Sequence, residues 1–414
     1  MSNQITLKEY EFLYFKEIES ENKKAHFINE KSFLELEKFV LANEESTPYL
    51  KLTSKKGFGK ILQAQNYVGV IQTKDDSTIE ILPKIQKQGS DELSVDESKN
   101  ILLKMLKTLK KSPFKHFNTA HLKSTKLPLL EIFISMFLEE LSLLIRKGIK
   151  SDYIHREENL HFLKGKLKIG EQIKHNSVHK ERFYVEYEEF SSDRVENRLI
   201  KTTLEYLYKK SHLNKNQQKI REFLFVFDEI KVSHTPKEDF KNLKSNREMK
   251  AYESVLLYAK TFLLENSFSP YKGSDVAFAL LFDMNLLFEF YVGAYLKKRG
   301  FDVKLQDKGK YLVETPNKFA LRPDIVINRG KDNEIVADTK YKNILSSKDI
   351  SQADMYQLYA YGTKYEKCSQ LYLIYPKNDL LELDSLSYIK DELHLNILFF
   401  DLSLNFEQDI GIKA

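Results

Sequence analysis

The stretch LRPDIVINRGKDNEIVADTKYK, residues 321–342, decides the fold. An apolar run, a polar turn over 328–333 and a second apolar run predict two β-strands joined by a tight turn. Side chains alternate between the two faces of a strand, so Asp338 and Lys340 share one face. Asp324 lies 14 residues before Asp338, which brings both acids to the same end of the hairpin. The sequence therefore predicts two carboxylates and an ammonium group that converge.

Charged groups among apolar residues are costly to bury unless an opposite charge compensates them. Mg²⁺ binds through one or two carboxylates together with water and phosphate oxygens. It can activate a water molecule, while Lys340 holds that water or the developing negative charge. We therefore expect phosphodiester hydrolysis with Mg²⁺, or Mn²⁺ as a substitute, bound by Asp324 and Asp338. The pattern resembles the active site of the PD-(D/E)xK nuclease superfamily; the alternative is a surface hairpin with an ordinary Asp-Lys pair.

Two flanking segments supply further candidates. Residues 277–299 predict one long apolar helix that carries Glu289 at its centre. In PD-(D/E)xK nucleases an acid on the helix before the hairpin completes the metal site, so Glu289 is a candidate metal ligand; the alternative is a glutamate that reaches the surface. Residues 353–365 predict a second helix, on which Gln357 can orient the metal-bound water or a phosphate. A helix that lines the core with tyrosines is the simpler account of its aromatic residues.

The composition limits the class of protein. A chain of 414 residues predicts two or three domains. The net charge is only +5, from 65 Lys+Arg and 60 Asp+Glu, so no charged tail indicates a nucleic-acid partner. The single cysteine, Cys368, excludes an intramolecular disulfide and a cysteine-rich zinc site, and it fits the reducing cytoplasm. We expect no signal sequence at the start and no membrane span, since acids interrupt the most apolar segments.

The fold class that we expect is mixed α/β (α+β), in three domains. Residues 1–85 predict a small β-rich domain, with a helix and several strands. Residues 86–265 predict a mainly helical middle region that binds DNA, and residues 266–414 the nuclease domain. In the first domain we expect strands at 49–53, 60–72 and 78–83 and a helix at 32–43. A polar segment at 86–100 marks the boundary to the middle region.

Other motifs in the first two domains are less informative. The lysine-rich run 104–126 either neutralises phosphates or is a solvated face. No G-x-x-x-x-G-K-[ST] pattern occurs, so we expect no nucleotide to be bound by this chain itself. In the middle region, 153–158 predicts a short strand, and Asp193 is expected to help cap a following helix. Four histidines there are scattered and are interpreted as structural: His155, His161, His175 and His179.

An ordered set of motifs resembles the McrC family, the nuclease subunits of McrBC-type and LlaJI-like restriction systems. The set consists of KGIKSDYIHREENLHFLKGKL (147–167), FYVEYEEFSSDRVENRLIK (183–201), LFEFYV (287–292), the hairpin, and YQLYAYG (356–362). The resemblance spans about residues 60–375. It implies that Asp324, Asp338 and Lys340 are the catalytic acids and lysine, and it matches Glu289 and Gln357 to the accessory positions.

The resemblance also implies partners. McrC proteins dock on a ring of McrB-like AAA+ subunits that hydrolyse GTP, stimulate that hydrolysis through their N-terminal part, and cut double-stranded DNA. Two other readings remain open. The chain could be a bridging, GTPase-activating subunit with an inert nuclease fold, against which the intact Asp, Asp-x-Lys set argues. It could also be a stand-alone nuclease that acts on branched DNA or RNA, which a neighbouring gene for a P-loop GTPase would argue against.

Overall fold

The computed structural model describes residues 4–18, 21–43, 49–85, 93–109, 112–116, 126–243, 247–264, 278–313, 317–344, 346–377, 393–402 and 411–412. The chain forms two compact units. One combines Met1–Leu129 with Asn266–Ala414, and the other is Leu130–Glu265. The first part of the expected polar boundary (86–92 of 86–100), parts of the lysine-rich run (110–111 and 117–125) and the start of the expected nuclease domain (266–277) lie outside the described residues. The rest of that boundary is not a linker, because a helix begins at Val95.

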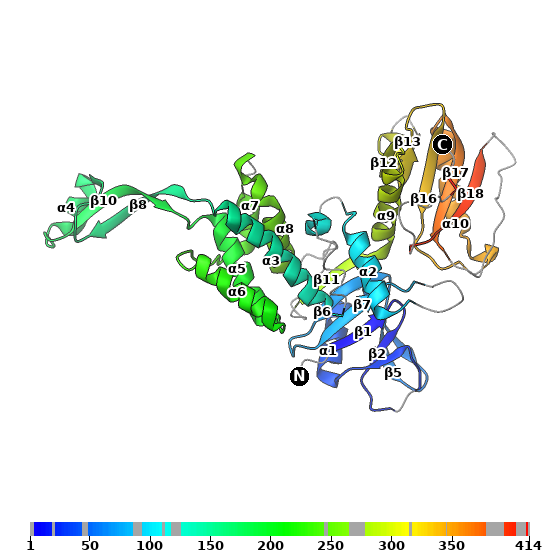
Figure 1. Cartoon of the computed structure of the whole chain (residues 1–414), viewed down its shortest axis with the longest axis horizontal. Helices are drawn as coiled ribbons and strands as arrows, with labels where there is room; N and C mark the ends of the chain where they lie inside the picture. Colours follow the sequence, from blue (N-terminus) through cyan, green and yellow to red (C-terminus); the bar gives the residue numbers. More distant parts are fainter. Residues whose placement is uncertain are drawn as a thin grey trace. The chain divides into compact units, whose positions relative to one another are not determined.

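The N-terminal part of the first unit contains two four-stranded sheets and a helix, α1 (Glu30–Asn43) (Figure 1). The first sheet has the order β1-β7-β6-β11, with β1 and β7 parallel and the other pairs antiparallel. Its strands are β1 (Gln4–Lys8), β7 (Thr78–Leu82), β6 (Tyr67–Gln72) and β11 (Phe278–Asp283). The second sheet has the order β3-β2-β5-β4, with strands β3 (Ala25–Phe27), β2 (Phe12–Tyr14), β5 (Gly59–Ala64) and β4 (Leu50–Lys55).

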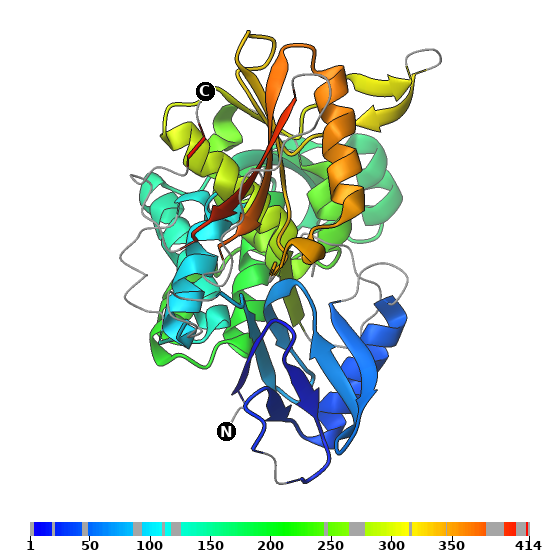
Figure 2. The same cartoon turned by 90° about the vertical axis from the view of Figure 1, so that its right-hand side faces the viewer.

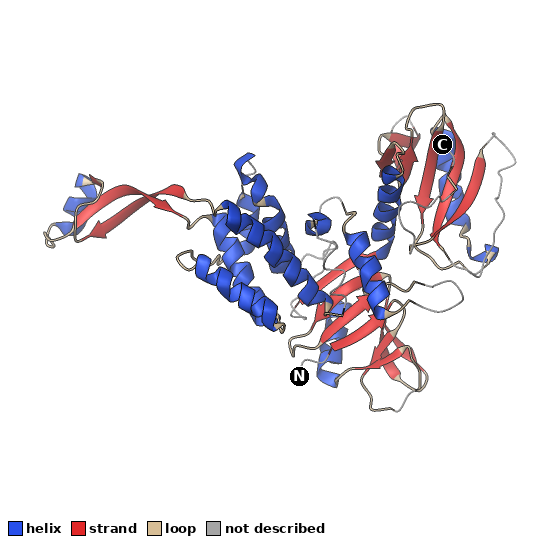
Figure 3. Ribbon diagram, in the orientation of Figure 1, coloured by secondary structure: helices blue, strands red, loops and turns tan. Residues whose placement is uncertain are grey.

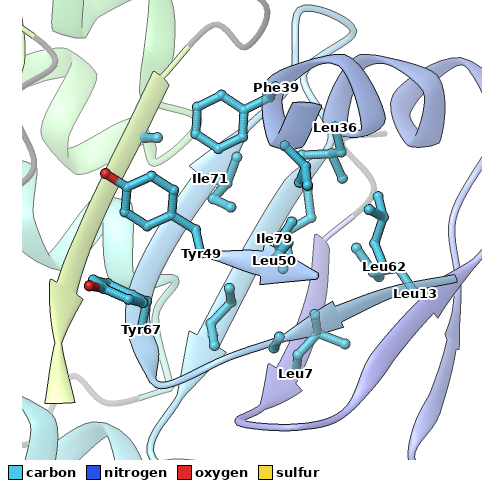
Figure 4. Close-up of a cluster of buried hydrophobic side chains, with 14 of the residues drawn as sticks. Leu7, Leu13, Leu36, Phe39, Tyr49, Leu50, Leu62, Tyr67, Ile71 and Ile79 are labelled. Atoms are coloured by element: carbon cyan, nitrogen blue, oxygen red, sulfur yellow. The ribbon is translucent and has the colours of Figure 1, made fainter. Parts of the chain in front are cut away.

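The core of this part forms where α1 packs on the sheets. Apolar residues of α1 recur at intervals of three and four positions, so they line one face of the helix. Leu36 and Phe39 are fully buried on that face, and Phe39 stacks on Tyr49 with ring centroids 5.9 Å apart. Figure 4 shows these side chains meeting Ile71 and Ile79 from the sheet.

Two expectations for secondary structure are wrong. The expected strand at 60–72 is two strands, β5 and β6, which belong to different sheets. The expected helix at 277–299 begins only at Met284, because Phe278–Asp283 forms strand β11 and pairs with β6. The register of that pairing sets Gly69 opposite Leu281. A β-carbon at Gly69 would meet the backbone oxygen of Leu280, so β11 can lie against β6 only because this position is glycine.

The C-terminal part of the first unit is a five-stranded mixed sheet with helices α9 (Met284–Lys298) and α10 (Gln352–Lys364). The strand order is β12-β15-β16-β17-β18; the pairs among β12, β15 and β16 are antiparallel, and those among β16, β17 and β18 are parallel. The strands are β12 (Val303–Leu305), β15 (Ile325–Ile327), β16 (Glu334–Thr339), β17 (Cys368–Pro376) and β18 (His394–Phe400). The expected hairpin is therefore present as β15 and β16.

Smaller elements complete this unit. The hairpin of β13 (Lys310–Val313) and β14 (Lys318–Leu321) extends beside the orange helix α10 in Figure 2. Helix α2 (Val95–Leu106) starts with a capping box between Ser94 and Glu97 and contacts both β7 and α9. Short 3₁₀ turns lie at Pro113–His116 and Ser347–Asp349.

The second unit combines helices with a long antiparallel ribbon (Figure 3). Its helices are α3 (Leu129–Lys147, which starts one residue before the unit), α5 (Val195–Lys210), α6 (Asn214–Val226), α7 (Pro236–Asn242) and α8 (Glu253–Leu263), with a 3₁₀ turn at Arg247–Ala251. The ribbon pairs β8 (Asp152–Leu160) with β10 (Phe183–Ser191), and it carries β9 (Lys166–Leu167) and α4 (Ile169–Asn176). The expected strand at 153–158 is thus the middle of a nine-residue strand.

The start of α5 differs from the expectation. Asp193 does not cap this helix; its carboxylate binds the guanidinium of Arg198, with the shorter contact at 2.6 Å, and accepts the backbone N–H of Lys231 at 3.0 Å. Among the helices of the described residues, none combines the length and the apolar character that crossing a bilayer requires.

Candidate active site

The register of β15 and β16 brings the two predicted acids together. Ile325 pairs with Ala337 across this antiparallel pair, so the next position outward sets Asp324 opposite Asp338. Directly opposed side chains lie on the same face of a sheet, with β-carbons about 4.5–5.5 Å apart. Asp338 is 2% exposed. The carboxylates therefore face the same buried space.

Thr339, the last residue of β16, fixes Asp324. Its backbone N–H and its hydroxyl both donate to Oδ2 of Asp324, at 2.8 and 2.7 Å. Burial raises the pKa of Asp324, although these bonds and the charge of Lys340 oppose the rise. Burial also raises the pKa of Asp338, and the negative charge of Asp324 adds to it. The charge of Asp324 thus makes Asp338 harder to ionise.

Lys340 lies at the centre of the charged groups. Its Nζ atom is 2.7 Å from Oδ2 of Asp338 and 3.9 Å from Oδ1 of Asp354. It also donates to Oε1 of Gln357 at 3.3 Å. Burial works against the charged ammonium, but the charge and hydrogen bond of Asp338 together with the charges of Asp354 and Asp324 outweigh it, and the pKa of Lys340 is raised. The lysine therefore stays protonated at neutral pH and serves as a fixed positive charge.

Glu289 comes to the same place from helix α9. It is 6% exposed, and its Oε2 atom accepts the side-chain N–H of Gln306 at 3.3 Å. Arg322 in turn donates to Gln306. Burial raises the pKa of Glu289 to about 8, and the charge of Asp324 is the next cause. The charges of Asp324 and Asp338 both raise the pKa of Glu289, so Glu289 belongs to the same cluster as the two aspartates.

The donor set fits a hard divalent cation. Oε1 of Glu289 is buried and has no hydrogen-bond partner among the described residues. Buried polar atoms are normally paired. Because the charges of Asp324 and Asp338 raise the pKa of Glu289, ionising all three carboxyls needs a positive charge beyond that of Lys340. Carboxylate oxygens are the ligands that Mg²⁺ prefers. Asp324, Asp338 and Glu289 are therefore the residues that would hold it.

The structure brings all five predicted site residues together, from β15, β16, α9 and α10. Their catalytic and metal-binding roles stay predictions. Sequence reasoning missed three residues that organise the cluster: Gln306, Arg322 and Asp354. Asp354, in the first turn of α10, also binds Lys342 at 3.0 Å. Its position three residues before Gln357 was a usable signal, because both then face the same side of a helix. Gln306 and Arg322 gave no such signal.

The ribbon contains an unexpected cluster outside this site. His155, interpreted from the sequence as structural, has potential ligand atoms within 4.8 Å of those of Glu157 and Glu186. These acids already bind lysines: Nζ of Lys168 lies 2.7 Å from Glu157, and Nζ of Lys166 lies 3.3 Å from Glu186. The cluster is thus exposed and already neutralised by its lysine partners.

Comparisons with known proteins bear on the whole chain. A family model described as McrBC 5-methylcytosine restriction system component matches residues 62–376. No curated protein matches the sequence. Two solved structures from Thermococcus gammatolerans are similar in fold. The first is a refined half-complex from a tetradecameric assembly of McrB AAA+ hexamers with bound McrC, at 19% identity, 98% coverage of this chain, 97% of that chain, and a TM-score of 0.69. The second is a cryo-EM structure of the McrBC complex, at 21% identity, 75% coverage of this chain, 90% of that chain, and a TM-score of 0.51.

Proposed function

Since the chain belongs to the family of McrBC 5-methylcytosine restriction system components, we propose that it is the McrC-type nuclease subunit of such a system and cleaves double-stranded DNA by Mg²⁺-dependent hydrolysis. The family assignment confirms the resemblance inferred from the sequence. The observation that carries the nuclease proposal is the convergence of Asp324, Asp338, Glu289 and Lys340 at the open end of one hairpin. We assign the five-stranded sheet with α9 and α10 to the PD-(D/E)xK fold.

The chemistry follows from where the charges lie. Mg²⁺, when bound, supplies a Lewis acid that polarises the scissile phosphate and activates water. Asp324 and Asp338 would supply carboxylate ligands, and Glu289 would add a third carboxyl. Lys340 holds the attacking water or stabilises the negative charge that develops on the phosphate. Gln357 restricts the ammonium of Lys340 to this position through their 3.3 Å contact.

The proposal includes a protein partner. In the Thermococcus gammatolerans half-complex, McrC is bound to McrB AAA+ hexamers. The present chain matches 97% of the length of the similar chain in that complex. We extend this arrangement to the present protein, which would bind an McrB-like AAA+ GTPase ring. The absence of a P-loop pattern in the sequence supports this division of labour. The β-rich domain of residues 1–85 would stimulate GTP hydrolysis, and the complex would act in the cytoplasm.

Cleavage of plasmid DNA tests the proposal. The protein and its variant Asp338→Ala are incubated with methylated or unmethylated plasmid, with Mg²⁺ and GTP, and with or without the P-loop protein encoded beside it. We expect cutting that requires the partner, GTP and Asp338. The variant should stay folded and keep its partner, because it removes one of two carboxylates that repel each other.

Other outcomes select other functions. Mg²⁺-dependent cutting by Asp338→Ala would refute the site. Cutting by the wild type without the partner would indicate a stand-alone nuclease. If neither protein cuts but both stimulate GTP hydrolysis by the partner, the chain is a bridging, GTPase-activating subunit with an inert nuclease fold.

A further inference from the structure

Tyr341 links the end of β16 to the N-terminal sheet. It follows Lys340 directly in the sequence, yet its hydroxyl donates to Oε2 of Glu9 at 3.0 Å. The two residues are 332 positions apart. Glu9 is fully buried, and Tyr341 is 9% exposed. Two consecutive residues at the end of β16 therefore contact different parts of the unit. Lys340 contacts the acid cluster, and Tyr341 contacts the first sheet.

Glu9 is itself firmly placed. Its backbone N–H donates to the carbonyl of Leu82 at 3.1 Å, and its Oε2 atom accepts the backbone N–H of Lys84 at 2.9 Å. Both contacts lie where the parallel strands β1 and β7 end. Burial raises the pKa of Glu9 to about 8. A buried carboxyl of this kind is tolerated because it is neutral over most of the physiological range and is held by two donors.

The same sheet is also connected to the opposite side of the active site. Strand β11 belongs to it, and α9 follows β11 without a break, because Asp283 ends the strand and caps the helix through the backbone N–H of Asn285 at 2.8 Å. Glu289 lies in the second turn of α9. The adjacent Phe288 packs on Tyr341, with ring centroids 5.8 Å apart. One sheet is therefore connected to both Glu289 and Lys340.

We propose that Glu9 and Tyr341 are positioning residues for DNA cleavage, whose hydrogen bond holds Lys340 in register with Glu289. This rests on the proposed nuclease function. The backbone of Lys340 is otherwise held by two bonds: its N–H donates to the carbonyl of Ile374 and its carbonyl accepts the N–H of Lys342, both at 2.9 Å. Strand β16 ends one residue earlier. Without the bond, the segment that carries Lys340 can shift. Small shifts are costly, because a misplacement of about 1 Å can reduce a rate on the order of a hundredfold.

Five variants, one of them the double variant of Tyr341→Phe and Glu9→Leu, test this inference in the complete complex with the partner GTPase, GTP and Mg²⁺, at a temperature well below unfolding. Tyr341→Phe removes only the donor. Glu9→Leu removes the acceptor and with it the bond from the backbone N–H of Lys84. Glu9→Gln keeps an oxygen that can accept both bonds. The matched control is Tyr252→Phe in the second unit, where another buried hydroxyl donates to Asn197 at 2.9 Å and accepts from Lys150 at 2.8 Å.

We expect Tyr341→Phe and Glu9→Leu each to lower kcat roughly tenfold while KM for DNA changes less than about twofold. The double variant should be no slower than Glu9→Leu, since the bond to Tyr341 is already absent in that variant. Glu9→Gln should restore a kcat close to that of the wild type. Tyr252→Phe should lose thermal stability without a change in kcat, and Tyr341→Phe should stimulate GTP hydrolysis by the partner as the wild type does.

Several results would overturn the inference. An unchanged kcat for Tyr341→Phe would show that the bond serves stability alone. A multiplied loss in the double variant would show that the two residues act separately. If Tyr341→Phe does not fold, an equal kcat for Glu9→Leu and Glu9→Gln would refute the bond from the other side. A wild type that stimulates GTP hydrolysis but never cuts would instead refute the nuclease function.

Discussion

The ammonium of Lys340 lies 2.7 Å from the carboxylate of Asp338, and so it compensates the charge that a metal ion would otherwise meet. A cation that binds this carboxylate must overcome repulsion from Lys340. The lysine therefore lowers the affinity of the site for Mg²⁺ while it supplies the charge that hydrolysis needs.

Lys340→Met should accordingly bind Mg²⁺ more tightly but fail to cleave DNA. Without the charge of Lys340, the carboxylates bind both protons and metal ions more tightly. The binding free energy of a divalent ion improves twice as much as that of the single proton that competes with it. We expect the dissociation constant to fall roughly tenfold at pH 8, measured by calorimetry. Lys342→Met is the control, because Lys342 pairs with Asp354 instead. Weaker Mg²⁺ binding by Lys340→Met would contradict this electrostatic account.

Stability without metal should fall as the pH rises from about 4.5 to about 8. Burial raises the pKa of Glu289 from 4.5 to about 8 and also raises that of Asp338. These carboxyls hold protons in the folded state at pH values where the unfolded chain has released them, so folding takes up protons in this window. This stabilisation is fully present below the pKa of the unfolded chain, and it is lost as the pH rises through the pKa of the folded protein.

Mg²⁺ should reverse this trend, because it needs the ionised carboxylates. The rise in Tm on adding Mg²⁺ should be larger at pH 8 than at pH 6, and calorimetry in buffers of different ionisation enthalpy should show proton release. In Glu289→Gln the proton release should be smaller. A Tm increment that does not depend on pH would rule out these carboxyls as the metal ligands.

Lys99→Met should destabilise the first unit by about 3–5 kcal/mol. Nζ of Lys99 lies 2.8 Å from Glu80, and the side chains of Lys99 and Glu80 are 4% and 0% exposed. The substitution leaves a buried carboxylate without its counter-charge. Adding Glu80→Met should recover part of the loss, which thermal unfolding of the single and double variants would reveal. An additive effect would mean that the two charges do not compensate each other.

Gly69→Ala should lower stability by about 3 kcal/mol or more and reduce DNA cleavage. A β-carbon here would meet the backbone oxygen of Leu280, which forces β11 away from β6 and shifts the start of α9. Gly330→Ala is the control: its φ is also positive, at 76°, but nothing lies within 4 Å of the added atom. This control should cost only about 1 kcal/mol. Equal losses in the two variants would exclude the steric cause.

The active-site hairpin was predictable because its signals are local. Alternating apolar residues, a polar turn and acids at fixed spacing all lie within residues 321–342, and the structure places Asp324 and Asp338 as the spacing indicated. Glu289 and Gln357 were also located correctly, since each is on a helix whose middle the sequence pattern indicated.

The parts that sequence reasoning missed depend on distant partners. A short apolar run fits a buried strand as well as a helix. Residues 278–283 became a strand because β6, about 200 positions earlier, offered an edge to pair with. The contacts of Gln306 with Glu289 and of Tyr341 with Glu9 likewise join segments that no local pattern relates.

The place of β11 in the first sheet has a consequence for biosynthesis. Its partner β6 ends at Gln72, while β11 begins at Phe278, so a ribosome must add the intervening chain before the sheet can be completed. At about 5–20 residues per second this takes roughly 10–40 seconds. Throughout that interval the nascent N-terminal segment has an unpaired strand edge at β6, which a chaperone can cover and which other nascent chains can join.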